Sequence, residues 1–260
     1  AQQLSRRLHY KKGEAHSYNN MGVVYYYQSD YPHTLENYLN ALKLFEETGD
    51  QVGIAIQTGN IGMVYTDQED YPKASAALNK ALEMNKKLGR TYGVAKSYAH
   101  IGLVYKMQND NVNALKNYEV ALNMYKKIGK AAIKEYASEI DNIGNIYYDA
   151  RNLDKALDCY KEAIAIFIQE HSMQDVVLNM GNMGAIYLDQ NKYKEAEAIL
   201  TRSLKMSDSL GLLFYSKDNH QNLSGLYEKL NEPAKALFHY KAYVIARDSI
   251  YNEDNTKKLV

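Results

Sequence analysis

The hexapeptide Asn60-Ile61-Gly62-Met63-Val64-Tyr65 recurs along the chain with nearly constant spacing. Its other copies begin at Asn20, His100, Asn142, Asn182 and Asn222. The small third residues lie 40, 40, 42, 40 and 40 residues apart, at Gly22, Gly62, Gly102, Gly144, Gly184 and Ser224. A fixed internal period of this size is typical of a solenoid or array built from one supersecondary unit.

A second pattern follows each copy after a short turn. A small residue is followed four positions later by an apolar or aromatic one, and three positions after that by a residue that is mostly small. The sets are Thr34, Tyr38, Ala41; Ala74, Leu78, Ala81; Ala114, Tyr118, Ala121; Ala156, Tyr160, Ala163; Ala196, Leu200, Ser203; and Ala236, Tyr240, Tyr243. Spacings of four and three put each set on one helical face. Pro32 and Pro72 stand where a second helix begins, a position that tolerates proline. Each unit is therefore predicted to be helix, turn, helix.

Glycine occurs at two regular places in these units. The second helix is predicted to end at Gly49, Gly89, Gly129, His171 or Gly211, because glycine readily takes the left-handed conformation that closes a helix. The glycine inside the first helix should cost about 1 kcal/mol relative to alanine, which requires a compensating gain. We expect that gain to be close packing against the small residues Thr34, Ala74, Ala114, Ala156 and Ala196.

The order of residues in each unit resembles the tetratricopeptide repeat over nearly the whole chain. The resemblance implies an all-α fold, a right-handed superhelix of antiparallel helix pairs. The sequence departs from the consensus of about 34 residues because its period is near 40, the leading Trp is replaced and the closing Pro is absent. The longer repeat is similar to those of kinesin light chains, of bacterial response-regulator phosphatase and peptide-receptor proteins, and of bacterial sensor proteins.

The expected domain organisation is a single array over residues 1–260. Residues 1–10 read as the tail helix of a truncated repeat, and residues 253–260 as a C-terminal helical extension. Six full repeats are predicted at residues 11–50, 51–90, 91–132, 133–172, 173–212 and 213–252. Solenoids need polar capping repeats, and neither end carries one, so we expect a fragment of a longer protein.

Composition disfavours several classes of partner. Lys+Arg and Asp+Glu both total 31, so no basic field is present to bind nucleic acid or an anionic membrane. The single cysteine, Cys159, rules out an internal disulfide framework and a cysteine-based zinc site, and we expect it to be a packed thiol. No apolar run approaches the roughly 20 residues that span a bilayer.

No motif for catalysis is present in the sequence. The seven histidines show no metal-ligand spacing, and neither a glycine-rich phosphate loop nor a G-x-S-x-G sequence occurs. We therefore expect no cofactor, no metal and no enzymatic activity within these residues, so that any activity would lie in an output domain outside them.

A polar residue two positions before the small residue of each hexapeptide is the candidate binding ladder. Its members are Asn20, Asn60, His100, Asn142, Asn182 and Asn222. Asparagine is a mediocre helix former, so its recurrence at one register calls for a reason. The family resemblance implies that first helices line a concave groove, where an amide can bond the backbone of a bound peptide. The alternative is that each amide bonds a neighbouring helix and orders the stack, and both interpretations stay open.

The same register predicts which other residues line the groove. They are Tyr26, Tyr27, Met63, Lys96, Leu103, Lys106, Asn145, Tyr148, Asp149 and Asp189. Lys96 and Lys106 alone do not reproduce the lysine and arginine clamp with which chaperone adaptors hold a C-terminal carboxylate, so that role is disfavoured. The stripe Tyr25, Tyr65, Tyr105, Tyr147, Tyr187 and Tyr227 is predicted to belong to the core.

The leading functional hypothesis is a scaffold that captures a peptide or protein segment in its concave face. The chain also resembles the repeat-containing sensor regions of bacterial signalling proteins, which precede a membrane span and a histidine kinase or nucleotide cyclase. That resemblance implies an extracytoplasmic regulatory region without direct membrane contact. The alternative function is structural, as a self-association or spacer module that forms homo-oligomers and has no dedicated peptide ligand.

Overall fold

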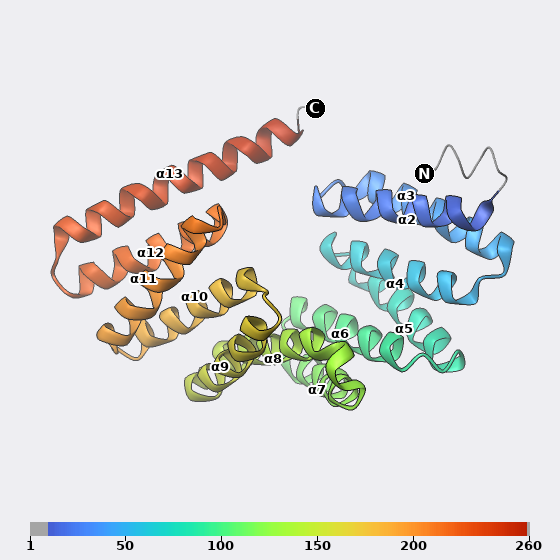
Figure 1. The fold of residues 1–260 in the computed structure, drawn as a ribbon, viewed down its shortest axis with the longest axis horizontal. Coiled ribbons are helices and arrows are strands. Elements are labelled where there is room, and N and C mark those ends of the chain that lie inside the picture. The colour runs from blue at the N-terminus through green and yellow to red at the C-terminus, as the bar shows by residue number, and fades with distance from the viewer. Residues whose placement is uncertain (1–9, 259–260) are drawn as a thin grey trace. The chain divides into compact units, whose positions relative to one another are not determined.

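The computed structural model describes residues 10–258, and the side chains of residues 10–252. The expected tail helix at residues 1–10 therefore lies almost entirely outside the described residues. Residues 10–258 form helices and turns without a β-strand (Figure 1). The helices are α2 (Lys11–Tyr27), α3 (Tyr31–Thr48), α4 (Gln51–Asp67), α5 (Tyr71–Lys87), α6 (Thr91–Met107), α7 (Asn111–Ile128), η1 (Gly129–Ala132), α8 (Ile133–Asp149), α9 (Leu153–Gln169), α10 (Met173–Asp189), α11 (Tyr193–Ser209), α12 (Leu213–Lys229) and α13 (Pro233–Lys258).

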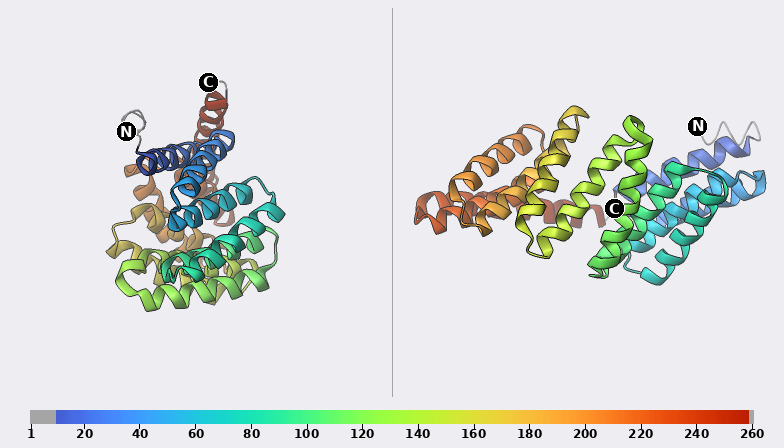
Figure 2. Two further views of the ribbon diagram at one scale, coloured as in Figure 1. Left: turned by 90° about the vertical axis from the view of Figure 1, so that its right-hand side faces the viewer. Right: turned by 90° about the horizontal axis from the view of Figure 1, so that it is seen from below.

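The helices follow the predicted order of alternating first and second helices. First helices are α2, α4, α6, α8, α10 and α12, and each carries one copy of the repeated hexapeptide. Consecutive helices pack as hairpins, for example α4 with α5 and α10 with α11 (Figure 2). First helices of successive hairpins also contact one another, α4 with α6 and α10 with α12. The all-α hairpin architecture expected from the sequence is confirmed.

The chain divides into two compact units. The first ends at Glu139 and the second begins at Ile140, so that the boundary falls within α8. Each unit has its own buried clusters, such as Leu78 with Ile101 and Val104 in the first, and Leu200 with Leu223 and Leu226 in the second. Each unit is therefore a run of stacked hairpins with its own apolar core.

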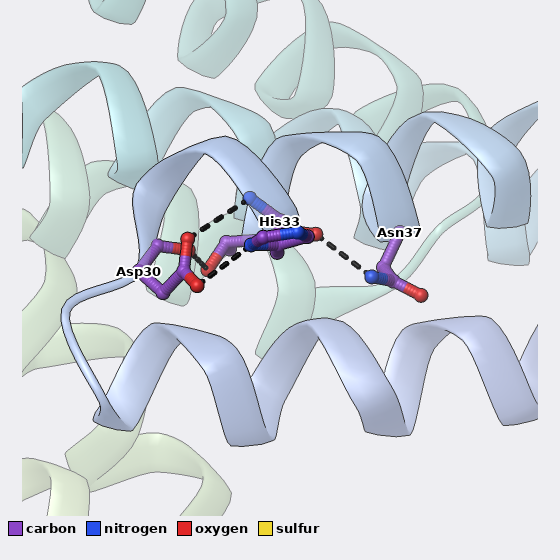
Figure 3. A network of polar contacts seen from close by, with 4 residues as sticks. Asp30, His33 and Asn37 are labelled. Atoms are coloured by element: carbon purple, nitrogen blue, oxygen red, sulfur yellow. Dashed lines mark hydrogen bonds and ion pairs between the residues drawn. The ribbon is translucent and has the colours of Figure 1, made fainter. Parts of the chain in front are cut away.

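Aspartates are the N-cap residues of several helices. Asp30 precedes α3, where its Oδ1 accepts a hydrogen bond from the backbone N–H of His33 at 3.2 Å and its Oδ2 lies 2.7 Å from the His33 Nδ1 (Figure 3). One turn further on, Asn37 Nδ2 donates to the His33 carbonyl at 2.8 Å. Asp70 and Asp110 cap α5 and α7 in the same way. Such a cap satisfies an otherwise unpaired N–H and contributes about 1 kcal/mol.

The ends of the helices confirm one prediction and add a feature that was not predicted from the sequence. The backbone has positive φ at each predicted end of a second helix: Gly49 (69°), Gly89 (65°), Gly129 (76°), His171 (55°) and Gly211 (67°). The turns that follow the first helices also need a residue with positive φ, but none is glycine there: Ser29, Glu69, Asn109, Arg151, Asn191 and Asn231. The single 42-residue step coincides with the additional 3₁₀ turn η1.

The glycine inside each first helix permits close packing, as predicted, but against a different residue. A Cβ added at Gly62 would lie 2.8 Å from Leu78 Cδ2, and the same conflict arises for Gly22 with Tyr38, Gly102 with Tyr118, Gly144 with Tyr160 and Gly184 with Leu200. The sequence pattern assigned the close approach to small residues such as Ala74. The large residue four positions later occupies the space instead, because it must reach across to the next first helix.

The tyrosine stripe lies at the edge of the core and not at its centre. Tyr227 is 6% exposed, but Tyr25, Tyr65, Tyr105, Tyr147 and Tyr187 are half-buried. Two of these rings lie beside lysines of the second helix: Lys73 Nζ is 5.4 Å from the centre of the Tyr65 ring, and Lys155 Nζ is 5.1 Å from that of Tyr147. The stripe therefore packs against the core as predicted, but from its edge.

Candidate ligand-binding face of the first helices

Two polar registers run along the first helices. The first is the predicted amide ladder, in which Asn20 is exposed and the other five residues are half-buried. The second lies five positions before the repeated small residue: Ser17, Gln57, Ser97, Glu139, Asn179 and Asn219. All of these except the half-buried Ser17 are buried. Sequence reasoning missed this second register because the residue type changes from repeat to repeat, although each member is polar.

Between α2 and α4 the amides bond each other. Asn19 Oδ1 accepts hydrogen bonds from Gln57 Nε2 at 2.6 Å and from Asn60 Nδ2 at 3.3 Å. Asn19 Nδ2 in turn donates to Asn20 Oδ1 at 3.3 Å. At this point the ladder joins neighbouring first helices, as the structural alternative requires.

A pocket of about 160 Å³ lies between α4 and α6, and we call it the α4–α6 pocket. Two ladder residues line it, Asn60 and His100, and its wall includes Ile56, Tyr92 and Gly59. A cavity near 150 Å³ is large enough for a benzene-sized group. The α4–α6 pocket can therefore hold about one side chain.

Cationic groups border the α4–α6 pocket. Arg90 Nη1 donates to Asn85 Oδ1 at 2.8 Å, and Lys96 also lines the pocket. Burial lowers the pKa of Lys96. Burial, and to a lesser degree the neighbouring Lys96, lowers the pKa of His100 to about 3, so His100 is neutral at physiological pH.

A second pocket, of about 250 Å³, lies between α10 and α12 at the corresponding register. It is lined by Asn182 and Asn222 from the ladder, by Asn219 from the second register, and by Gly181, Asp218 and Gln221. Asn182, Asn222 and Gln221 make no hydrogen bond through their side chains with other residues in the described part of the chain. In this α10–α12 pocket the ladder amides do not join helices, in contrast to Asn60.

Asp141 is an acid held in a poorly solvated place on α8. Burial raises its pKa to about 7, with a smaller contribution from the charge of Asp175. Its Oδ1 is buried without a hydrogen-bond partner. Because desolvation disfavours the charged form, this carboxyl group titrates near neutral pH.

Several predicted groove residues contact one another across neighbouring first helices. The Tyr148 hydroxyl donates to Asp189 Oδ2 at 3.3 Å, and Arg151 Nη1 lies 2.7 Å from the same oxygen. Burial raises the pKa of Tyr26, and the neighbouring Asp67 raises it further. These pairs link a tyrosine of one first helix to an aspartate of the next.

The other predicted groove residues vary in exposure. Asn145 Oδ1 accepts a hydrogen bond from the Tyr160 hydroxyl at 2.7 Å, which joins it to its own second helix. Tyr27 is 83% exposed, and Asp149 is exposed at the end of α8. The half-buried ones are Met63, Leu103 and Lys106.

Residues 10–252 do not bring together three or more histidine, cysteine or acidic side chains that could hold a metal ion. Burial raises the pKa of the Cys159 thiol to about 11, so the thiol stays protonated at neutral pH, in agreement with a packed side chain. Among residues 10–258, no helix combines the length and apolarity that a membrane span needs.

Comparison with known proteins identifies the fold family. The tetratricopeptide-repeat family model matches residues 13–87, 54–127 and 136–209, which together cover more than half of the chain. No curated protein matches the sequence.

Solved structures with the same fold share little sequence with this chain. BtubC (BKLC) from P. vanneervenii superposes with a TM-score of 0.70 at 17% identity, covering 86% of this chain and 90% of that one. The apo form of RapI superposes with a TM-score of 0.68 at 16% identity, covering 92% of this chain and 84% of that one. A Rap protein complexed with competence and sporulation factor superposes with a TM-score of 0.66 at 17% identity, covering 93% of this chain and 76% of that one. The chain belongs to the tetratricopeptide-repeat family and has its helical solenoid fold.

Proposed function

We propose that the chain captures an extended peptide or protein segment along its first helices, as the regulatory or sensor region of a larger bacterial signal-transduction protein. One observation carries the proposal: Asn182 and Asn222 face one pocket and leave their hydrogen-bonding groups unused within the described residues. An amide offers both donors and an acceptor, which suits the alternating N–H and C=O groups of an extended backbone.

The pockets supply side-chain sites beside that backbone track. The α4–α6 pocket and the α10–α12 pocket occur at the same register of successive first helices within their units, and each accommodates about one side chain. A Rap protein, which shares the fold, has been solved with competence and sporulation factor bound, and this supports a peptide as the ligand class. The signalling output would belong to another domain or partner.

The proposal is tested by selecting ligands from random sequences. The full chain is immobilised and used to select from a displayed library of random 12-residue peptides, and the enriched peptides are synthesised with a fluorophore. Fluorescence anisotropy then compares the wild type with Asn182→Ala/Asn222→Ala. We expect the double variant to lose about tenfold or more in affinity, the factor for one or two lost hydrogen bonds.

The matched control is Asn123→Ala, which removes an exposed amide from the second helix α7. It should bind the selected peptides as the wild type does. Enriched peptides whose affinity is the same for all three proteins would contradict the proposal. Loss of helicity or a change of oligomeric state in the double variant would instead assign these amides to the repeat stack.

A further inference from the structure

The buried amide of Asn219 has a fixed orientation. Its Nδ2 donates to Ser203 Oγ at 2.9 Å, and Ser203 Oγ donates its own proton to the Val177 carbonyl at 3.1 Å. The serine hydroxyl has a single proton, so only its lone pairs remain for Asn219. The amide must therefore present its NH₂ group to Ser203, and its Oδ1 points elsewhere.

Asn219 Oδ1 is an unused acceptor in a place with room for a ligand atom. Asn219 is 2% exposed, and its Oδ1 has no hydrogen-bond partner. A Cβ added at Gly181 would lie 3.5 Å from this oxygen. Among the described residues outside α10, no other side chain comes within 4 Å of that position. An unpaired buried acceptor is costly, and ligand binding would offset this cost.

The other polar groups of the α10–α12 pocket favour a positively charged ligand group. Asp218 lines the pocket, whereas no lysine or arginine does. Lys217 Nζ lies 3.0 Å from Asp218 Oδ1, while its ammonium also sits 4.2 Å from the centre of the Phe214 ring. Apart from Lys217, Asp218 has no ion-pair or hydrogen-bond partner for its side chain among the described residues.

We infer that the α10–α12 pocket binds a cationic hydrogen-bond donor, the guanidinium or ammonium group of a side chain on the captured segment. The donor bonds Asn219 Oδ1 in the space that Gly181 leaves, and Asp218 balances its charge. This inference rests on the proposed function, since it assigns one residue of the ligand to one pocket.

The corresponding pocket of the first unit provides the control. Gly59 stands at the same register as Gly181, three positions before the repeated glycine, and its nearest contact is Ala81 at 3.7 Å. Arg90 and Lys96 border that pocket, and Asp and Glu side chains do not. A cationic group should therefore bind beside Gly181 and not beside Gly59.

The test uses the ¹⁵N-labelled full chain and four small probes: N-acetyl-arginine amide, N-acetyl-lysine amide, and the neutral N-acetyl-citrulline amide and N-acetyl-norleucine amide. Chemical shifts of the Gly181 backbone amide and the Asn219 side-chain amide report binding. We expect saturable shifts with the arginine probe, the lysine probe or both, at concentrations where the neutral probes cause none. The two cationic arms decide between guanidinium and ammonium.

Gly181→Ala fills the space at ordinary contact distance and should weaken binding about tenfold or more, as expected for one lost charge-assisted hydrogen bond. Asp218→Asn should weaken it as well, while Gly59→Ala should leave it unchanged. The inference is overturned if neither cationic probe shifts these signals, if the neutral probes bind equally well, or if Gly181→Ala binds as the wild type does.

This failure is distinguishable from failure of the proposed function. Selected peptides that depend on Asn182 and Asn222, with no binding of a cationic probe, would overturn only the pocket assignment. A cationic probe that binds beside Gly181, without any peptide captured by the chain, would overturn only the proposed function.

Discussion

Gly184 and Leu200 are so close that a Cβ added to the glycine would clash with Leu200 Cδ2. Leu200 is fully buried and also packs against Leu223 and Leu226, so it has little room to move. Gly184→Ala should therefore destabilise the protein, although alanine is the better helix former by about 1 kcal/mol. Overpacking of this kind costs about 1–3 kcal/mol. Urea unfolding followed by circular dichroism should show a lower midpoint.

Combining Gly184→Ala with Leu200→Ala provides the control for this explanation. Each change alone should destabilise, but the pair should lose less than the sum, because the added methyl group occupies part of the space that the leucine leaves. Additive losses would show that the effect of Gly184→Ala does not arise from contact with Leu200.

Gly181→Ala should have the opposite effect on stability. It lies in the same helix only three positions earlier, but its added Cβ would meet Asn219 Oδ1 at 3.5 Å, which is an ordinary contact. Alanine should then raise the free energy of unfolding by up to about 1 kcal/mol through helix propensity. We expect a higher Tm for Gly181→Ala. We expect the same for Gly59→Ala, because a Cβ added there would come no closer than 3.7 Å to its nearest neighbour, Ala81 Cβ. A lower Tm for Gly181→Ala would mean that the space beside Asn219 is smaller than the structure shows.

The contrast between these two glycines shows how far sequence reasoning extends. The repeated spacing predicted Gly184 as a packing position and Gly211 as a helix end, because both follow from helical periodicity and backbone conformation. It did not identify Gly181 or Asn219. Their environment depends on Ser203 of the second helix and Asp218 of the next first helix, which only the packed structure brings together. The charge of the α4–α6 pocket likewise depends on Arg90, a residue between two helices.

The turn residue Glu69 should be replaceable by glycine with a gain in stability. Its φ is 60°, in the left-handed region that costs a residue with a Cβ roughly 1–2 kcal/mol. Glycine avoids that cost but is more flexible in the unfolded chain, so we expect a net gain of about 0.5–1 kcal/mol in Glu69→Gly. Thermal unfolding of the wild type and Glu69→Gly measures this gain in stability. Glu83→Gly, inside α5, should lose about 1 kcal/mol, and a loss in both variants would contradict the conformational explanation.

Asp141 should make stability depend on pH across an unusual range for an aspartate. Burial raises its pKa from 3.8 to about 7 in the folded chain. The folded state therefore binds the proton more tightly than the unfolded state, so this group's contribution is fully present below pH 3.8 and is lost as pH rises toward 7. The loss amounts to about 1.4 kcal/mol for each unit by which the two pKa values differ.

Asp141→Asn removes this titration and isolates its effect from those of the other acids. The free energy of unfolding, measured in urea at a series of pH values, should fall for the wild type relative to Asp141→Asn as pH rises from 4 to 7, and the difference should then level off. Asp158→Asn, which replaces an exposed carboxylate on α9 by an amide, is the matched control for the change from acid to amide. A flat difference for Asp141→Asn would show that its carboxyl group is solvated in the folded protein, because desolvation is the main cause of the raised pKa.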